Sequence, residues 1–293
     1  MAYGFIPSEY IAFDFVDKKP DERRQFCSDL DTNVFGYTVN NIVEVQKILN
    51  KASSANKYQK LLKRDYLIIS NKTEFESFHS FVSNHQVFVK KKVFSSMGKG
   101  VELIDIKDIA NSEADYFEKL ISSGTWLLEE RVIQRKEMGC FNESSVNTVR
   151  CMTFKTRDGI VVPYCFMRTG RNGAFVDNGG SGGLLMGIDV TNGVVDTDAL
   201  DEYGVKYETH PDSGIAFKGF VIPEWGELLA ICKNAAEKEK DMGYLSWDMA
   251  YCDQGWVVIE VNEVGQFIGP QMVYQKGIKK ELWQYLDHMV KCI

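Results

Sequence analysis

Near the C-terminal end of the chain, apolar and polar residues alternate over two stretches separated by a short break. The stretches are residues 246–251 and 256–262, and Cys-Asp-Gln-Gly stands between them. β-Branched and aromatic residues on both sides of an Asp/Gly break are typical of two strands joined by a tight turn. The pattern therefore predicts a β-hairpin, and a turn around Gln254 would set Asp248 opposite Glu260.

The two faces of this hairpin differ in chemistry. Side chains alternate along a strand, so Glu260 and Asn262 point the same way, and Asp248 joins them. The other face is apolar and would carry Trp247, Met249, Tyr251, Val257, Ile259 and Val261. Two carboxylates and an amide oxygen on one platform suit Mg²⁺. The alternative is an ordinary amphipathic hairpin whose polar face meets solvent.

The same reading predicts the other elements. Helical spacing of apolar residues indicates helices over 20–30, 43–49, 53–62, 222–240 and 279–289, and a surface helical region over 105–122. Runs rich in β-branched and aromatic residues indicate strands over 86–91, 101–104, 125–133, 148–156, 160–168, 184–190 and 194–195. Asp-Gly and Asn-Gly pairs at 158–159 and 192–193 predict hairpins, and residues 265–270 are expected to form a loop. We expect three parts: a short N-terminal segment (1–55), a small lobe (56–133) and a large lobe (134–293).

A strand ending in Lys91 is followed by a small-residue loop that closes on Gly98-Lys99-Gly100. Glycine permits positive φ, so successive backbone N–H groups of such a loop converge on phosphate. The alternative is a surface hairpin with exposed lysines at a sheet edge. Lys57 is expected in the first turn of a helix, where a lone lysine is most often a solvated charge.

The predicted strand over 125–133 is apolar and then becomes acidic, at Glu129 and Glu130. Such a strand end can hold an adenine edge with carboxylates near the ribose, or it can simply be a core strand leaving the interior. Arg150 and Arg168 lie within predicted strands, where an inward-pointing arginine needs an anionic partner. That partner is either a ligand or a carboxylate of the protein itself.

Composition narrows the class of protein. The net charge of −7 argues against a general nucleic-acid or membrane-surface role. No apolar run approaches the roughly 20 residues of a membrane span. Seven cysteines without a CxxC pair, and four histidines that do not cluster, fit reduced thiols in a cytoplasm and indicate no zinc site.

Taken in order, these features resemble the ATP-grasp superfamily. More narrowly, the chain is similar to the sugar-transfer-associated ATP-grasp family, which is encoded beside polysaccharide biosynthesis genes. The narrower resemblance rests on the segments Asn142–Arg150, Val176–Asn178 with Gly182-Gly183, His210–Gly214, Ile222–Trp225 and Trp247–Ala250. It implies an α+β fold in which two lobes enclose a nucleotide, with a shortened N-terminal lobe.

The resemblance also implies roles for individual residues. Phosphate contacts are expected from Lys57, Lys91 and the loop Gly98, Lys99 and Gly100. The adenine and ribose hinge is expected at Glu129, Glu130 and the backbone through Val132. Mg²⁺ ligands are expected at Asp248, Glu260 and Asn262. Arg150 and Arg168 would face the transferred phosphoryl group or an acidic substrate, and Asp177, Asn178 and His210 would line the acceptor side.

The chain departs from this pattern in two places. The family usually has proline after the strand lysine and several glycines in the loop, where this sequence has Lys92, Ser95, Ser96 and Met97. With fewer glycines, the mobility of this loop and its closure over the phosphates would differ from those in the family. The N-terminal lobe is also shorter than in many superfamily members, so part of substrate recognition would be missing or supplied by a partner.

The activity that the resemblance implies is an ATP- and Mg²⁺-dependent carboxylate–amine ligase that acts through an acyl phosphate on small, sugar-linked substrates. One alternative is a kinase with a hydroxyl acceptor and His210 or Asp177 as general base. Another is a nucleotide-binding module without catalysis, suggested by the unusual Ser-Ser-Met loop.

Overall fold

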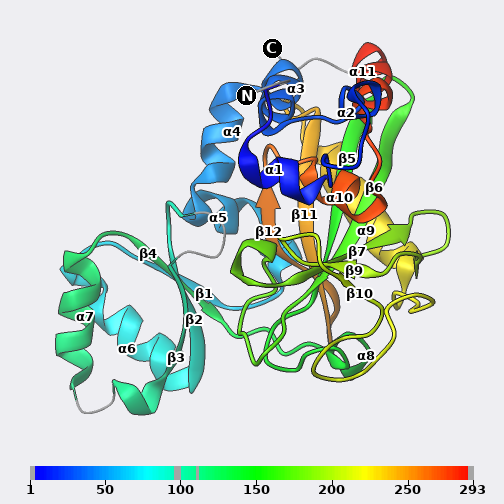
Figure 1. Cartoon of the computed structure of the whole chain (residues 1–293). Coiled ribbons are helices and arrows are strands. Elements are labelled where there is room, and N and C mark those ends of the chain that lie inside the picture. The colour runs from blue at the N-terminus through cyan, green and yellow to red at the C-terminus, as the bar shows by residue number, and fades with distance from the viewer. Residues whose placement is uncertain (1–3, 96–99, 110–111, 290–293) are drawn as a thin grey trace. The chain divides into compact units, whose positions relative to one another are not determined.

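The computed structural model of the chain describes residues 4–95, 100–109 and 112–289 (Figure 1). The chain divides into two compact units: Lys47–Ile133, and Met1–Gln46 together with Gln134–Ile293. Each unit combines helices with an antiparallel sheet, which confirms the α+β class.

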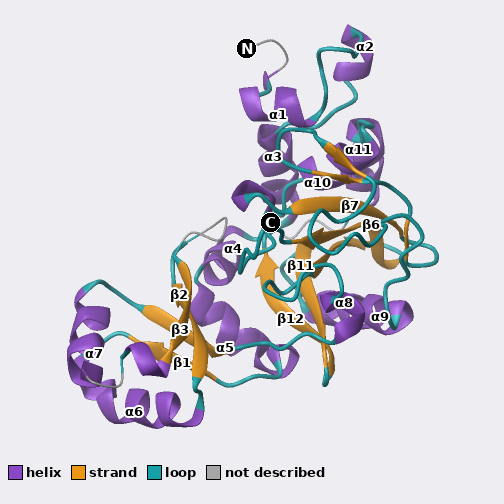
Figure 2. Ribbon diagram, turned by 60° about the horizontal axis from the view of Figure 1, so that its bottom comes forward, coloured by secondary structure: helices purple, strands orange, loops and turns teal. Residues whose placement is uncertain are grey.

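The smaller unit is built on a four-stranded antiparallel sheet. Its order is β1 (Tyr66–Ile69), β4 (Trp126–Glu130), β2 (Val87–Lys92) and β3 (Val101–Asp105). One face packs against α6 (Phe75–Asn84) and α7 (Glu113–Ser122) (Figure 2). There Phe88 and Leu128 belong to one buried apolar cluster with Phe78 and Phe117. Because side chains alternate along β2 and β4, Lys91 and Glu129 lie on the other face. The unit also contains α5 (Lys51–Leu62) and the short 3₁₀ helices η2 (Lys72–Glu74) and η3 (Ile106–Asp108).

The larger unit contains an eight-stranded antiparallel sheet. The strands, in spatial order, are β10 (Lys206–Tyr207), β9 (Ala199–Leu200), β7 (Leu184–Asp189), β6 (Gly159–Thr169), β5 (Thr148–Thr156), β11 (Tyr244–Cys252) and β12 (Gly255–Asn262), and β8 (Val194–Val195) pairs with β7. The helices are α1 (Pro7–Ala12), α2 (Pro20–Arg23), α3 (Asp29–Val39), α8 (Lys136–Gly139), α9 (Trp225–Lys238), α10 (Ile268–Tyr274) and α11 (Lys279–His288), with the short η5 (Gly179–Ser181). Helix α4 (Ile42–Leu49) spans the boundary between the units.

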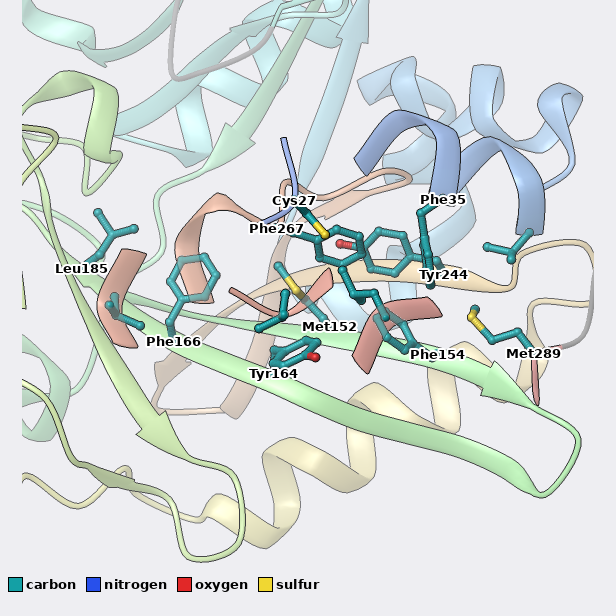
Figure 3. Packing of buried hydrophobic residues seen from close by; sticks show 14 residues of the cluster. Cys27, Phe35, Met152, Phe154, Tyr164, Phe166, Leu185, Tyr244, Phe267 and Met289 are labelled. Atoms are coloured by element: carbon teal, nitrogen blue, oxygen red, sulfur yellow. The ribbon is translucent and has the colours of Figure 1, made fainter. Parts of the chain in front are cut away.

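The two faces of the large sheet bury different groups. Helix α9 packs on one face, where its Cys232 meets Cys151 of β5. The other face carries an aromatic cluster in which Phe35 of α3 contacts Phe154, Tyr244 and Phe267, with ring centroids 5.3, 5.8 and 5.3 Å away (Figure 3). This cluster anchors the N-terminal helix α3 to strands from the second half of the chain.

Truncation of Phe35 tests that anchor. We expect Phe35→Ala to lower the free energy of unfolding by about 3–5 kcal/mol, because it leaves a cavity among buried rings. Leu30 lies on the same helix and is 66% exposed, so Leu30→Ala should change stability by less than about 0.5 kcal/mol. Urea denaturation of both variants measures the difference, and equal effects would contradict the packing described.

The predicted hairpin register is confirmed, since Asp248 pairs with Glu260. The register shifts directly after this pair, so Val258 pairs with Met249 and Val257 pairs with Ala250. The assignment of Val257 to the apolar face was therefore wrong, because a β-bulge places one extra residue on β12 and moves Val257 to the face of Asp248. Every residue of β11 except Cys252 is buried, including Asp248 on its polar face. The polar face of β11 therefore does not meet solvent, and the alternative of an ordinary amphipathic strand does not hold for it.

Three further predictions about elements were wrong. The helix predicted over 20–30 is two helices, because Ser28 caps a new one by accepting a hydrogen bond from Asp31 N at 3.2 Å. Helix α5 begins at Lys51, so Lys57 lies in its second turn. Residues 265–270 were expected to form a loop, but α10 begins within them at Ile268. Pro270 lies in the first turn of this helix, where proline is tolerated.

Candidate functional site

Polar side chains from four strands converge on the face of the large sheet that also carries the aromatic cluster. In the sheet, Asp248 of β11 lies between Arg150 of β5 and Glu260 of β12. Thr148 of β5 pairs with Arg168 of β6. Paired residues in neighbouring strands point to the same face of a sheet, so the strand pairing brings these side chains next to one another.

Asp248 accepts hydrogen bonds from both predicted arginines. Arg150 binds it through two nitrogens, Nε to Oδ1 and Nη2 to Oδ2, each at 2.6 Å, and Arg168 Nη2 lies 3.0 Å from Oδ2. Asp248 is 3% exposed. Burial alone would raise the pKa of the Asp248 carboxyl, but Arg150 and Arg168 outweigh it and hold that pKa well below its usual range.

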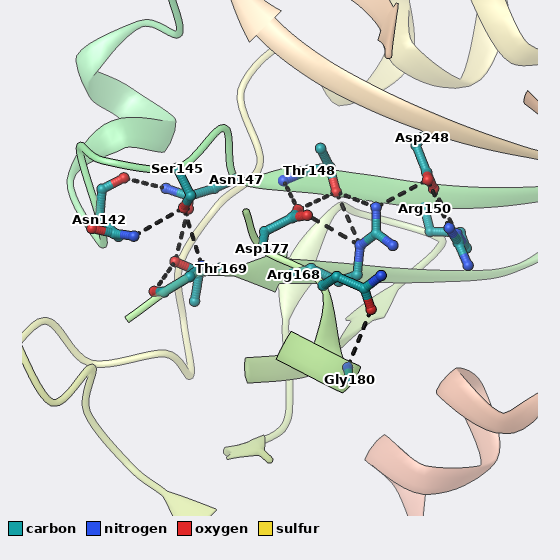
Figure 4. Close-up of polar contacts among 12 residues, drawn as sticks. Asn142, Ser145, Asn147, Thr148, Arg150, Arg168, Thr169, Asp177, Gly180 and Asp248 are labelled. Atoms are coloured by element: carbon teal, nitrogen blue, oxygen red, sulfur yellow. Dashed lines mark hydrogen bonds and ion pairs between the residues drawn. The ribbon is translucent and has the colours of Figure 1, made fainter. Parts of the chain in front are cut away.

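Thr148 and Asp177 extend this arrangement toward the glycine-rich segment after β6. Arg168 donates to Thr148 Oγ1 from Nη2 at 2.7 Å, and Thr148 donates to Asp177 Oδ2 from its hydroxyl at 2.5 Å and its backbone N at 3.0 Å (Figure 4). Arg168 Nε is also 3.6 Å from Asp177 Oδ2. We call Asp248, Arg150, Arg168, Thr148 and Asp177 the Asp248 cluster.

The three predicted metal ligands lie together on this face. Asp248 is paired with Glu260, Ser246 is paired with Asn262, and Asn262 Nδ2 lies 3.4 Å from Asp248 Oδ2. Among the described residues no group of three or more His, Cys, Asp or Glu could hold a metal. The set proposed here has two carboxylates and one amide, whose chemistry fits a hard divalent cation. Such a cation must compete with the arginines for the Asp248 carboxylate.

The residues predicted to line the acceptor side have structural partners. Asp177 belongs to the Asp248 cluster, and Asn178 Oδ1 accepts from Gly180 N at 3.2 Å, which caps the short η5. His210 is fully buried; its Nε2 lies 2.8 Å from Gly170 O, and its Nδ1 accepts from the backbone N of Asp212 at 3.2 Å. Both ring nitrogens of His210 are engaged within the protein, so we do not place it against a substrate.

Asn142, Ser145 and Asn147, to which no chemical role was assigned from the sequence, form a buried hydrogen-bond network with Thr169. Asn147 Oδ1 accepts from Ser145 Oγ at 2.8 Å and from Thr169 Oγ1 at 2.9 Å (Figure 4). A Cβ added at Gly170 would lie 2.7 Å from Ser145 Oγ and from Asn142 Nδ2. The network therefore fixes the start of β5 and the end of β6, which carry Thr148 and Arg168.

In the smaller unit, Lys91 forms an ion pair with Glu129, and Arg64 is a second partner of the same carboxylate. Arg64 Nη2 and Nε donate to Glu129 Oε1 at 2.5 and 3.1 Å. Glu129 is 3% exposed. Burial would raise the pKa of Glu129, but Arg64 and Lys91 lower it to about 2. The sequence reasoning missed Arg64, because nothing in its neighbourhood distinguishes it from other charged residues at helix ends.

The other residues of the predicted nucleotide site are placed as follows. Lys57 is exposed on α5, with its Nζ 5.7 Å from the Tyr58 ring centroid. Glu130 Oε2 accepts from Asp65 N at 3.1 Å, and Val132 follows β4 in a half-buried loop. Gly98 and Lys99 lie outside the described residues, and Gly100 has a φ of +73°, a conformation that favours glycine. The predicted lysines thus belong to the smaller unit and the predicted metal ligands to the larger one.

The sequence matches one protein family, described as sugar-transfer-associated ATP-grasp, over residues 35–286. No curated protein matches the chain. A bilayer-spanning helix is not found in the described part of the chain.

Solved structures of ATP-grasp enzymes share the fold. A complex of the ATP-grasp ligase PsnB with a minimal precursor has a TM-score of 0.51 at 14% identity, and the match covers 84% of this chain and 62% of that one. N5-carboxyaminoimidazole synthase from Aspergillus clavatus, in complex with ADP and 5-aminoimidazole ribonucleotide, gives 0.52 at 9% identity, covering 87% and 55%. The D-alanine–D-alanine ligase from Coxiella burnetii gives 0.51 at 10% identity, covering 85% and 59%. The chain thus spans somewhat more than half the length of these neighbours, and their fold confirms the predicted ATP-grasp architecture.

Proposed function

The chain belongs to the sugar-transfer-associated ATP-grasp family, and we propose that it is an ATP-dependent ligase that joins a carboxylate to an amine. The observation that supports this proposal is the buried Asp248 cluster, in which two arginines lie on the same sheet face as the oxygen-bearing side chains of Asp248, Glu260 and Asn262. The neighbours that share the fold include ligases, which favours the same class of reaction here.

Nucleotide binding is assigned to the smaller unit. Lys57, Lys91 and the loop with Gly98, Lys99 and Gly100 would contact the phosphates, because cationic side chains and converging N–H groups stabilise them. The hinge is assigned to Glu130 and to the backbone from Glu129 to Val132. The Glu129 side chain is excluded from it, since its carboxylate is buried against Lys91 and Arg64.

Arg150 and Arg168 would stabilise charge on the transferred phosphoryl group. The substrate carboxylate attacks the γ-phosphorus, the bond to the β–γ bridging oxygen breaks, and ADP leaves with that electron pair. An amine then attacks the acyl carbon, the bond from that carbon to the phosphate oxygen breaks, phosphate leaves with the electron pair, and the nitrogen loses a proton to solvent. Mg²⁺ bound by Asp248, Glu260 and Asn262 would neutralise charge on the nucleotide phosphates.

An assay of phosphate release tests this proposal. Purified protein with Mg-ATP is incubated with uronic acids or amino acids, the classes suggested by the link to surface polysaccharides, with and without an amine. We expect phosphate and ADP release that requires both the acid and the amine. A stable phosphorylated product formed without an amine would instead establish a kinase, and nucleotide binding without turnover for any pair would establish a binding module.

The ligase is favoured over the kinase by the surroundings of the two candidate bases. A kinase of this design needs a general base at the acceptor hydroxyl. His210 is fully buried with both nitrogens engaged, and Asp177 accepts two hydrogen bonds from Thr148. Neither side chain is poised to take a proton from a substrate, whereas the ligase reaction starts from a carboxylate that is already ionised.

A further inference from the structure

Arg171 lies two residues beyond the end of β6, and the proposed function gives it no role. Its side chain is 16% exposed. The guanidinium donates three hydrogen bonds: Nε to Gly182 O at 2.8 Å, Nη1 to Tyr207 Oη at 2.6 Å, and Nη2 to Asp201 Oδ2 at 3.2 Å. Arg171 therefore joins the glycine-rich segment 177–183 to the turn between β9 and β10.

The turn between β9 and β10 holds its end of this contact firmly. Asp201 Oδ1 accepts from the backbone N of Tyr203 and of Val205, both at 3.0 Å, and Tyr207 Oη donates to Asp201 Oδ2 at 3.2 Å. The Tyr207 ring centroid lies 5.0 Å from Arg171 Cζ, a distance at which a guanidinium is attracted to an aromatic face. A carboxylate, a hydroxyl and a ring thus fix the orientation of the Arg171 guanidinium.

The glycine-rich segment 177–183 is held near both of its ends. At its start, the Asp177 carboxylate accepts two hydrogen bonds from Thr148 in the Asp248 cluster. Near its end, Gly182 O accepts from Arg171. The segment is compact between these points, since a Cβ added at Gly183 would overlap the Asp177 carbonyl group. Loss of the Arg171 contact would leave the segment fixed by Asp177 alone at its start.

The position of the segment gives this contact a consequence for substrate binding. Asp177 Oδ2 lies 3.6 Å from Arg168 Nε, and Arg168 is one of the two arginines proposed to stabilise the transferred phosphoryl group (Figure 4). Gly180 and Ser181, in the middle of the segment, are exposed. An acid that attacks phosphorus beside Arg168 is therefore expected to contact this segment. Ordering a binding segment in advance raises affinity, because less conformational entropy is lost on binding.

We propose that Arg171 is a positioning residue that fixes the segment 177–183 in the conformation that binds the substrate acid. This inference rests on the proposed function, because it takes the acid to bind beside Arg168. It assigns to Arg171 an effect on affinity for the acid and none on affinity for ATP.

Two measurements on the full chain test this role. Hydrogen exchange, followed by mass spectrometry of peptides that cover 177–183, reports the order of the segment without requiring turnover. We expect Arg171→Met, which keeps an apolar stem and removes the guanidinium, to speed exchange in these peptides about tenfold. Steady-state kinetics with an acid and amine pair that supports turnover should show the KM for the acid raised about tenfold, with kcat and the KM for ATP within about twofold.

Three further variants serve as controls. Arg157→Met removes an exposed arginine from the turn between β5 and β6, and should leave both the exchange of 177–183 and the KM for the acid within about twofold. Tyr207→Phe removes the hydroxyl that accepts from Arg171 and should raise the KM for the acid about threefold. Arg171→Lys should recover part of the loss, because lysine keeps the charge without the planar fork. Thermal unfolding identifies variants that are unfolded, and Tyr207→Phe replaces Arg171→Met in both measurements if the latter is among them.

Three outcomes would overturn the inference. Unchanged exchange over 177–183 in folded Arg171→Met would show that the segment is ordered without the guanidinium. Faster exchange with an unchanged KM for the acid would show that Arg171 is structural only, and the ligase assignment would stand. If the wild type turns over no acid and amine pair, the proposed function fails and the substrate role of Arg171 fails with it, whereas exchange still decides whether Arg171 orders the segment.

Discussion

Replacing Asp248 with asparagine is expected to lower the free energy of unfolding by roughly 3–5 kcal/mol, the usual cost of removing one partner from a buried ion pair. The reason is the position of Asp248 between Arg150 and Arg168, which make three contacts of 3.0 Å or less with its carboxylate. An asparagine has no charge to offset the two guanidinium groups and directs an N–H group at one of them. Urea denaturation at neutral pH measures the loss.

Asp253 provides a matched control for Asp248. It lies in the turn of the same hairpin, its side chain is 97% exposed, and its distance of 4.0 Å from Arg135 marks a weak surface pair. Asp253→Asn should therefore change stability by less than about 0.5 kcal/mol. A loss below about 1 kcal/mol for Asp248→Asn would show that the arginines find other partners and that the cluster is not buried as described.

The free energy of unfolding should also depend on pH in the acidic range. The pKa values of Asp248 and Glu129 are both lowered in the folded protein, the latter to about 2. A depressed carboxyl pKa contributes stability that is present above the unfolded-state value of about 4 and is lost as pH falls through the folded-state value. We expect the unfolding free energy to fall steadily below about pH 4, and to fall less steeply in Asp248→Asn. Denaturation at a series of pH values measures both slopes, and parallel slopes would contradict the assignment.

The second large effect is on activity. Glu260→Gln is expected to reduce ATP turnover at least about 100-fold, since it removes one of the two carboxylate ligands proposed for Mg²⁺. Glu260 is only half-buried, so the variant should remain folded, in contrast with Asp248→Asn. The initial rate of ADP formation, measured with the acid and amine pair that supports turnover in the wild type, gives the ratio.

Glu237→Gln is the control for Glu260. Glu237 is exposed on α9, on the opposite face of the sheet from the Asp248 cluster, and should keep full activity. A Glu260→Gln variant with wild-type turnover would remove the metal assignment. Recovery of part of the lost activity at higher Mg²⁺ concentration would support it, because a weakened site is refilled by mass action.

The hairpin could be predicted from the sequence because its signal is local. Alternation over 246–251 and 256–262 together with the turn residues set the pairing of Asp248 with Glu260, and the structure has that pairing. The bulge after this pair could not be foreseen, since it alters no apolar or polar pattern. Helix α10 was missed because Gly269 and Pro270 usually signal a loop, yet both occupy its first turn.

The partners of the charged residues could not be predicted, because they depend on strands distant in sequence. Arg150 was expected to need an anion, and a carboxylate of the protein was one alternative; that carboxylate is Asp248, which was predicted to bind metal. Likewise Glu129 was expected at the hinge, and the structure shows that its carboxylate is bound to Lys91 and Arg64. In both cases the sequence indicated that a charged residue needs a partner of opposite charge, but it could not identify that partner.

The bond between Asp177 and Thr148 has a consequence for divergence within such enzymes. Asp177 opens the glycine-rich segment 177–183, while Thr148 stands on a central strand and holds Arg168. Grafting that segment from a homologue in order to alter acceptor preference would succeed only if the donor also carries an acidic residue in this place. Without it, the exchange would loosen an arginine on the sheet, and a change meant for the substrate would reach a residue that we propose acts in phosphoryl transfer.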